Sequence, residues 1–376
     1  MSQELLKFAN TGVHSLRPYE PGKPAEDLER ELGVTDVIKL ASNENPLGPS
    51  VSAREILQQW RGDLALYPDG NGFKLKQSLA QLHNIDRACI TLGNGSNDIL
   101  DLIARLFLGP GRASLFSQYG FAIYRLVTLA ANGEPREIPA LPADNEMPLG
   151  HDLDAFVQAL GEEVRVVFIA SPNNPTGTWN EADALETFLD KVPADTVVLL
   201  DEAYREYLHP AHQPLSRDWL RRYPNLVITR TFSKVHGLAG LRVGYALSSP
   251  EIADLMNRVR QPFNVNALGL LCAEAALDSD EHIRASLALN NAERDKMREQ
   301  LSSMGLTVLP SQANFLTFNC GGPSTPVYDE LLRHGVIVRP LAGYAMPEYL
   351  RVTIGLPEQN QRFLNALKTA LASADV

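Results

Sequence analysis

The sequence predicts an α/β fold, with a three-layer large domain built on a mostly parallel central sheet and a smaller α+β domain. Along the first two thirds of the chain, short apolar runs typical of buried strands alternate with segments of helical periodicity. Past a stretch containing proline and asparagine at 261–264, the pattern changes to short strands interspersed with helices. A chain of 376 residues is long enough to build two such domains.

Three segments are expected. Residues 1–49 are broken by prolines and hold one short apolar run, which suggests an N-terminal arm that also supplies part of the small domain. Residues 50–260 are expected to form the large domain and residues 261–376 the small C-terminal domain, with the turn-rich stretch at 261–264 as the hinge.

Within the large domain, helices are expected where apolar residues recur every three or four positions, and strands where short apolar runs end in turn residues. The run at 164–170 resembles a strand buried on both faces, as in a parallel sheet. The helix after Ser249-Pro250 has the serine cap and first-turn proline typical of a helix start. In chain order the expected elements are a strand at 36–41, helices at 50–61 and up to about 82, a strand at 89–92, a helix at 99–107, a strand at 113–116, a helix to about 131, strands at 164–170, 196–200 and 225–230, and the helix from 250.

The C-terminal part is expected to mix the two kinds of element. Two helices at about 265–278 and 280–304 lead into it. Expected next are strands at 306–308 and 314–318, a helix near 325–334, strands near 336–339 and 349–354, and a final helix at 357–371.

Composition and charge exclude several classes of protein. With 44% hydrophobic and 21% charged residues the chain is globular, and its net charge of −11 argues against nucleic-acid binding. The three cysteines are widely spaced, so neither a disulfide framework nor a metal site is predicted, and a reduced cytoplasmic setting is expected. The N-terminus lacks the pattern of a signal peptide, and no apolar run is long enough to cross a bilayer.

Four consecutive strand ends carry polar residues. They are Gly95-Ser96, Asn174, Asp201 and Lys234. In open α/β sheets ligands bind at the carboxyl ends of the strands, so we expect these residues to meet in one site. A carboxylate such as Asp201 at the end of a buried strand is costly unless a cationic group faces it.

The residue types indicate an aldehyde cofactor with a phosphate and a pyridine nitrogen. Lys234 would bind the aldehyde as a Schiff base and later act as the base, since a buried lysine near cations has a lowered pKa. Asp201 would keep the pyridine nitrogen protonated, and Tyr119 would stack on the ring. The phosphate would be held by the backbone amides at 95–97, by Thr231 and Ser233, and by Arg242, while Asn174 and Tyr204 would bind the phenolic oxygen.

The chain resembles the fold-type-I aminotransferases that depend on pyridoxal 5'-phosphate, and among them it is similar to the histidinol-phosphate aminotransferases. The resemblance runs nearly end to end and its motifs, in this order and spacing, are highly specific. They are R-P-Y-E-P-G-K-P at 17–24, I-K-L-A-S-N-E-N-P-L-G-P at 38–49, Y-P-D-G at 67–70, G-N-G-S-N-D at 93–98, S-P-N-N-P-T-G at 171–177, D-E-A-Y at 201–204, T-F-S-K at 231–234 and G-L-A-G-L-R-V-G-Y at 237–245.

The resemblance assigns roles to individual residues and implies a homodimer with shared active sites. Lys234, Asp201 and Tyr204 are implied as catalytic. Tyr67 is implied to reach the phosphate of the other subunit's cofactor. The implied phosphate ligands are Ser96, Asn97, Thr231, Ser233 and Arg242, and the implied substrate-binding residues are Tyr19, Asn43, Tyr67, Arg339 and Arg351, of which Arg351 binds the substrate's carboxylate or phosphate.

Two positions depart from the family pattern. The family's usual G-S-D-E is G-S-N-D at 95–98, which removes one carboxylate but keeps the backbone amides that bind phosphate. After Lys234, Val235-His236 replace the expected Ala-Tyr. We expect His236 to be a packing or hydrogen-bonding side chain rather than a second base.

The implied reaction is transamination of histidinol phosphate with 2-oxoglutarate in histidine biosynthesis. The alternatives are an aromatic or broad-specificity amino acid aminotransferase and a related decarboxylase of a phosphorylated amino acid. A ligand-sensing domain on this fold would need a DNA-binding module, for which the first 49 residues are too few. A nicotinamide dehydrogenase would need a glycine fingerprint, which Asp98 interrupts.

Overall fold

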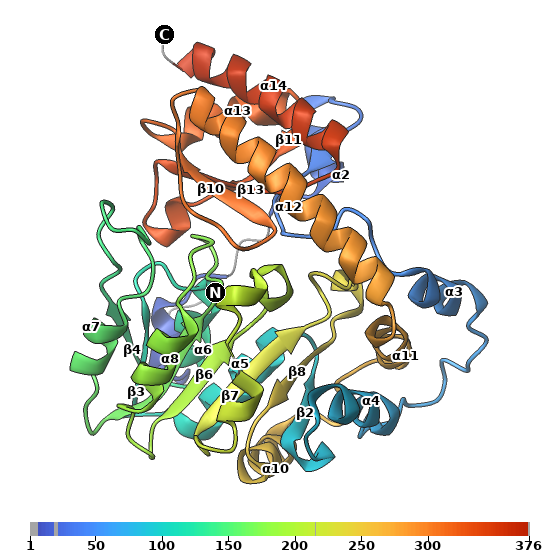
Figure 1. The fold of residues 1–376 in the computed structure, drawn as a ribbon, viewed down its shortest axis with the longest axis vertical. Coiled ribbons are helices and arrows are strands. Elements are labelled where there is room, and N and C mark those ends of the chain that lie inside the picture. The colour runs from blue at the N-terminus through green and yellow to red at the C-terminus, as the bar shows by residue number, and fades with distance from the viewer. Residues whose placement is uncertain (1–6, 19–21, 215, 375–376) are drawn as a thin grey trace.

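The computed structural model describes residues 7–18, 22–214 and 216–374. Figure 1 shows a lower part built on a large twisted sheet and an upper part with smaller sheets and the C-terminal helices. The long helix α12 (Asp280–Ser303) runs from the lower part along the upper one.

Within the described residues the largest sheet has seven strands, and all but one of them are parallel. The exception, β8, pairs antiparallel with both of its neighbours, β2 and β7. In spatial order the strands are β2 (Ile90–Gly93), β8 (Gly244–Leu247), β7 (Leu226–Thr231), β6 (Val197–Asp201), β5 (Val164–Ala170), β3 (Ala113–Ser117) and β4 (Glu134–Ile138).

Both faces of this sheet are covered. In β5, Val167 and Ile169 join one hydrophobic cluster, while Val166 and Phe168 join another on the opposite face. The predicted three-layer α/β fold is therefore confirmed. The accompanying helices are α3 (Val51–Gln59), α4 (Phe73–His83), α5 (Ser96–Phe107), α6 (Ala122–Ala130), α7 (Leu153–Gln158), α8 (Ala182–Leu189), α9 (Ser216–Trp219), α10 (Pro250–Val259) and α11 (Ala267–Leu277).

The C-terminal part has a core of its own, into which α12 inserts Met297 and Leu301. Segment 38–39 from the N-terminal arm pairs in parallel with 336–337, so the arm joins this part of the molecule. The domain boundaries drawn from the sequence stay a prediction. Besides α12, the elements of the C-terminal part, with two from the arm, are β1 (Ile38–Lys39), α2 (Ala25–Leu32), β9 (Thr307–Val308), β10 (Phe315–Asn319), α13 (Ser324–Arg333), β11 (Val336–Ile337), β12 (Arg339–Pro340), β13 (Tyr349–Thr353) and α14 (Pro357–Ala374).

The elements that the sequence did not indicate include one helix of the arm and two strands, besides the short helices α7, α8 and α9. Helix α2 lies in a stretch described only as charged, and it buries just Leu28. Edge strand β4 is mostly polar and contains Pro135, which an edge position tolerates. Strand β8 has only four residues and follows a glycine-rich turn. Within the described part of the chain, no helix combines the length and apolar character that crossing a membrane requires.

Candidate active site

A cavity of about 400 Å³ lies where the carboxyl ends of the central strands meet the C-terminal part and the N-terminal arm. Its floor comes from the ends of β6 and β7 and the start of α5, and Arg339 and Arg351 reach it from β12 and β13. The predicted residues that line it are Asn43, Ser96, Asn97, Asn174, Asp201, Tyr204, Thr231, Ser233, Lys234, Arg242, Arg339 and Arg351.

Lys234 projects into this cavity three residues after the end of β7. Its Nζ donates a hydrogen bond to the Ser42 carbonyl at 3.2 Å and lies 5.5 Å from the ring centre of Tyr204. Burial, together with the positive charge of Arg351, lowers the pKa of the amine to about 8. A larger fraction of this amine is therefore neutral near pH 7 than of an exposed lysine, and only the neutral form is a nucleophile or base.

Asp201 ends β6 and is only 5% exposed. The Tyr124 hydroxyl donates to its Oδ2 at 2.9 Å and the Ala203 amide donates to its Oδ1 at 3.1 Å. Burial raises the pKa of this carboxyl to about 6, although the Tyr124 hydrogen bond opposes the rise. The carboxylate is thus arranged to meet a cationic group inside the cavity.

An anion cradle is formed where helix α5 begins beside the loop after β7. Ser96 and Asn97 open the helix, so their backbone amides have no partner within it. The Arg242 Nη1 donates to Ser233 Oγ at 3.4 Å, and the Ser233 amide donates to Thr231 Oγ1 at 3.0 Å. Helix amides, two hydroxyls and a guanidinium form the donor set that binds a phosphate dianion.

Glycine at position 95 keeps this cradle open. Its φ is +81°, and a Cβ there would come within 2.4 Å of Arg242 Nη2. Any side chain at this position would strain the backbone and push the guanidinium away. The local sequence therefore sets the geometry of the cradle.

The opposite wall carries a second cation, the buried Arg351. Its Nη1 donates to Asn174 Oδ1, and its Nη2 donates to the Ala41 carbonyl at 2.7 Å. Next to it, Asn43 Nδ2 donates to the Tyr204 hydroxyl at 2.8 Å. Burial raises the pKa of that hydroxyl, so Tyr204 enters the site as a neutral hydrogen-bonding group.

Comparison with known proteins shows the family of the chain. A family model described as aminotransferase class I and II matches residues 35–367. The chain belongs to this family. The cavity of this aminotransferase lies wholly within the matched residues apart from Gly22, which comes from the arm.

Similar proteins share one description. A protein of Pseudomonas aeruginosa named histidinol-phosphate aminotransferase 2 is 52% identical and covers 98% of this chain and 99% of its own length. One of Nitrosococcus oceani named histidinol-phosphate aminotransferase 1 is 49% identical and covers 99% of each chain. The crystal structure of histidinol-phosphate aminotransferase from Sinorhizobium meliloti in complex with pyridoxal-5'-phosphate aligns with a TM-score of 0.88 at 28% identity, over 97% of this chain and 98% of that one.

Three predicted site residues of the aminotransferase lie elsewhere or are not described. Tyr119 packs in a cluster with Leu341 and Tyr344, beside the lined cavity rather than in its lining. Tyr67 is 81% exposed and its ring stacks on Phe263 with 4.5 Å between centroids. Tyr19 lies outside the described residues. Their roles stay predictions.

Other lining residues were not found by sequence reasoning. Tyr124 lies in α6 and Phe121 is the N-cap of that helix. Tyr344 lines the cavity from the C-terminal part, and Glu44 lines it from the N-terminal arm. Only Glu44 lay in a quoted motif. Tyr124 falls on a regular helical repeat, and the sequence contains no signal that its hydroxyl reaches a carboxylate 77 residues away.

His236 is part of the packing beneath the loop. It is within 4.9 Å of the Phe232 ring centre, and burial lowers its pKa to about 4. A neutral, buried imidazole outside the lining of the cavity is consistent with the packing role expected for it.

Proposed function

We propose that this aminotransferase uses pyridoxal 5'-phosphate to convert histidinol phosphate and 2-oxoglutarate into imidazole-acetol phosphate and glutamate, a step of histidine biosynthesis. The relatives at about 50% identity carry the name of that activity over their full length. The observation that carries the proposal is the meeting of Lys234, Asp201 and the anion cradle in one cavity of about 400 Å³.

The residues present fit this cofactor. Arg242, Ser233, Thr231 and the amides of α5 suit its phosphate, and the space that a Cβ at Gly95 would fill keeps their donors accessible. Asp201, raised in pKa by burial, suits a pyridinium nitrogen, which would place a positive charge beside the carboxylate. When bound, pyridoxal phosphate supplies an aldehyde that condenses with amines and a protonated ring that withdraws electrons from the substrate's α-carbon.

Each protein group then has one task. Asp201, oriented by Tyr124 and the Ala203 amide, would form an ion pair with the ring nitrogen and keep it protonated. At about 4 Å and an effective dielectric near 20 such an ion pair is worth roughly 4 kcal/mol. Lys234, with its pKa lowered to about 8, would serve as the base that moves a proton between the substrate's α-carbon and the cofactor's C4′ carbon. Asn174 and Tyr204, which line the cavity, would bind the phenolic oxygen.

The substrate's own anion would be bound by Arg351 and Arg339 on the far wall. A guanidinium binds a carboxylate or a phosphate with the same paired N–H groups. One arginine pocket therefore serves glutamate in one half-reaction and the phosphate ester in the other. Asn43 and Tyr19 are proposed as further substrate contacts.

A direct comparison of substrates tests the proposal. Histidinol phosphate and phenylalanine are assayed side by side with 2-oxoglutarate as acceptor, with carbon dioxide release measured in parallel. We expect histidinol phosphate to have the higher kcat/KM and no carbon dioxide to form. Faster turnover of phenylalanine would favour an aromatic or broad-specificity aminotransferase, and carbon dioxide release would favour a decarboxylase of phosphorylated amino acids.

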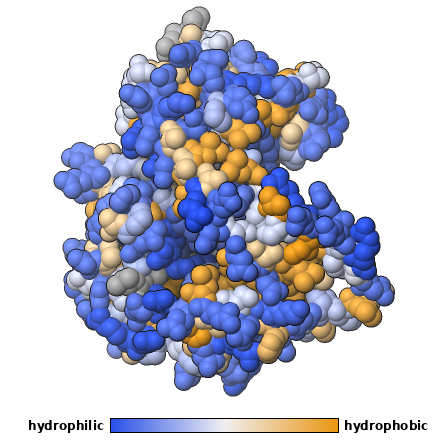
Figure 2. Space-filling view, turned by 45° about the vertical axis from the view of Figure 1, so that its right-hand side comes forward, coloured by the Kyte–Doolittle hydropathy of each residue, from blue (hydrophilic) through white to orange (hydrophobic). Residues whose placement is uncertain are grey.

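We also propose that the protein is a cytoplasmic homodimer with shared active sites. The segment from α3 to α4 exposes several large apolar side chains, and Figure 2 shows apolar groups on either side of the hollow between the upper and lower parts. Exposed apolar surface of this extent is typical of an interface between subunits. Its residues include Val51 at 65%, Leu64 at 83%, Leu66 at 71%, Tyr67 at 81% and Phe73 at 57% exposure.

A further inference from the structure

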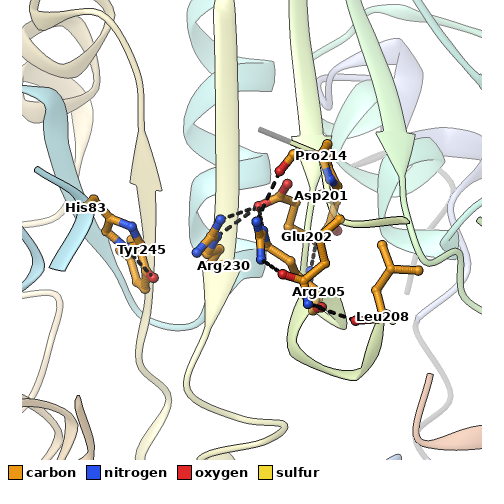
Figure 3. A network of polar contacts seen from close by, with 10 residues as sticks. His83, Asp201, Glu202, Arg205, Leu208, Pro214, Arg230 and Tyr245 are labelled. Atoms are coloured by element: carbon orange, nitrogen blue, oxygen red, sulfur yellow. Dashed lines mark hydrogen bonds and ion pairs between the residues drawn. The ribbon is translucent and has the colours of Figure 1, made fainter. Parts of the chain in front are cut away.

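A buried polar network lies directly beneath the active site, on the other face of the sheet (Figure 3). At its centre is Glu202, whose side chain is fully buried. Its Oε2 accepts hydrogen bonds from Arg230 Nε at 2.9 Å and Nη2 at 2.7 Å. Arg205 Nε lies 3.4 Å from the same oxygen. Two partly buried guanidinium groups therefore converge on one fully buried carboxylate.

Two residues of the network are direct sequence neighbours of residues proposed to bind the cofactor. Glu202 follows Asp201 at the end of β6, and Arg230 precedes Thr231 at the end of β7. Successive residues of a strand point to opposite faces of the sheet. The side chains above the sheet thus face the cofactor, while their immediate neighbours below it form the ion pair.

The same arrangement extends to the neighbouring strand. Arg230 is paired in register with Tyr245 of β8, whose hydroxyl lies 3.0 Å from His83 Nε2 of α4. The residue before Tyr245 is Gly244, where a Cβ would come within 2.4 Å of the Ser96 amide nitrogen. The start of α5, which forms the anion cradle, therefore packs against the start of β8, next to Tyr245 of the network.

Arg205 extends the network to the segment after Tyr204. Its Nη1 donates to Gln213 Oε1 at 2.5 Å and its Nη2 to the Pro214 carbonyl at 3.1 Å. The ion pair at Glu202 thus joins the ends of two strands and the loop that carries Tyr204. Glu202, Arg205, Arg230 and Tyr245 do not line the active-site cavity, whereas Asp201, which Figure 3 also shows, does.

Burying the Glu202 carboxylate and most of its two arginine partners is expensive compared with burying apolar residues of similar size. Such a network is useful where a particular register matters more than maximal stability. Here the register sets the spacing between Asp201, which would face the ring nitrogen, and Thr231, which would face the phosphate. A shift of about 1 Å between reacting groups is enough to cost about a hundredfold in rate.

We propose that Glu202 is a positioning residue for the cofactor. By holding Arg230 and Arg205 beneath the sheet, it fixes the ends of β6 and β7 at the separation that the ring and the phosphate of one cofactor molecule require. This inference rests on the proposed use of pyridoxal phosphate. Glu202 acts through Asp201 and Thr231 and touches neither cofactor nor substrate.

The test is a titration of the cofactor-free protein with pyridoxal phosphate, followed by the absorbance of the bound cofactor across pH. For Glu202→Gln we expect the Kd to rise at least about tenfold and the pH midpoint of the absorbance to move, because Asp201 no longer faces the ring nitrogen squarely. In steady-state assays with saturating cofactor, kcat should fall more than KM rises.

The matched control is Glu293→Gln. Glu293 is also a buried carboxylate, with Lys296 Nζ at 2.9 Å and Asn360 Nδ2 at 2.9 Å, but it lies on α12 away from the cavity. We expect a comparable loss of stability in urea and an unchanged Kd. Arg230→Lys is the second variant, because it keeps the charge of the ion pair and loses the bidentate contact with Glu202. It should raise the Kd by a smaller factor than Glu202→Gln. It should also fold if Glu202→Gln does not.

Unchanged Kd and unchanged absorbance titration in a folded Glu202→Gln or Arg230→Lys variant would overturn the positioning role alone. An equal rise in Kd for Glu293→Gln would overturn it too, since any buried charge would then act alike. If the unaltered protein fails to bind pyridoxal phosphate, the proposed function itself is wrong.

Discussion

Lys234 combines burial with positive neighbours, and the two effects act in the same direction on its amine. Arg351 and Arg242 both lower its pKa, which reaches about 8. We predict that Lys234→Ala abolishes the yellow absorbance of the bound cofactor and lowers kcat by at least about a thousandfold, because both the covalent partner and the base are lost.

The measurement is an absorbance spectrum with a transamination assay. Lys368→Ala, at an exposed position of α14, is the control and should behave as the unaltered protein. Circular dichroism should show that both variants keep the fold. Retained turnover in Lys234→Ala would refute the assignment of the catalytic lysine.

Asp201 should reduce the stability of the cofactor-free protein at neutral pH. Its folded-state pKa of about 6 lies above the ordinary value of 3.8, so the folded state holds the proton more tightly than the unfolded state. The stabilising effect is complete below about pH 4 and is lost as the pH rises through about 6. The shift of about two pKa units corresponds to a cost of up to about 3 kcal/mol above that range.

We therefore predict that Asp201→Asn, which resembles the protonated form, makes the cofactor-free protein more stable at about pH 8 by up to about 3 kcal/mol, and by less at about pH 5. Urea unfolding at equal protein concentration measures the difference. Asp154→Asn, whose side chain is 86% exposed, should change stability little at either pH. In contrast, Asp201→Asn should bind the cofactor more weakly. A variant no more stable than the unaltered protein at about pH 8 would contradict the burial argument.

At the scale of elements, the start of α5 shows how one backbone position controls a binding site. Gly95 and Gly111 both adopt positive φ, at +81° and +76°, but a Cβ at Gly111 would meet nothing within 4 Å. We predict that Gly95→Ala raises the cofactor Kd at least about tenfold by displacing Arg242. Gly111→Ala has a similar backbone cost of about 1 kcal/mol and should leave the Kd unchanged. Equal Kd values for the two variants would show that the contact with Arg242 is unimportant.

The strands whose ends carry the site were predictable because they are the most apolar in the chain. β5, β6 and β7 are buried along almost their whole length, and each is followed directly by turn residues and polar side chains. Strand β8 was not predicted, because four residues after a glycine-rich turn give too short a pattern. Its antiparallel pairing with β2 and β7 depends on the tertiary fold alone.

The residues of the candidate site likewise divide into those that the local sequence predicts and those that it does not. Residues within local motifs, such as Lys234 and Arg242, were found because sequence spacing sets their geometry. Tyr124 and the Glu202 network were not, because their roles come from contacts across the sheet between residues that local periodicity does not connect. Tyr119 was proposed from its place after the strand at 113–116, and in the structure it lies in a cluster beside the cavity, so its contact with the ring stays a prediction.

At the scale of the whole molecule, the proposed homodimer concerns Tyr67, which the family resemblance implies as a cofactor ligand. Tyr67 is exposed and stacks on Phe263, outside the lining of its own cavity. Phe263 is itself 42% exposed and has a positive φ of +58°, so both stacked rings belong to the exposed apolar surface. If a second copy covers this surface, Tyr67 is available to the partner's cofactor phosphate, as the family resemblance implies.

Mixing two inactive variants distinguishes an active site shared between subunits from one complete in each. A dimer of Lys234→Ala with Tyr67→Ala has one site with both lesions and, if Tyr67 acts across the interface, one site with neither. We predict that Tyr67→Ala alone has low activity and that denaturing and refolding the two variants together restores about a quarter of the unaltered activity, because about half of the dimers are mixed and each has one intact site. Refolding each variant separately is the control. Activity no higher than the average of the two variants, with mixed dimers verified by mass, would mean that Tyr67 serves its own subunit, because each site of a mixed dimer would then keep one lesion.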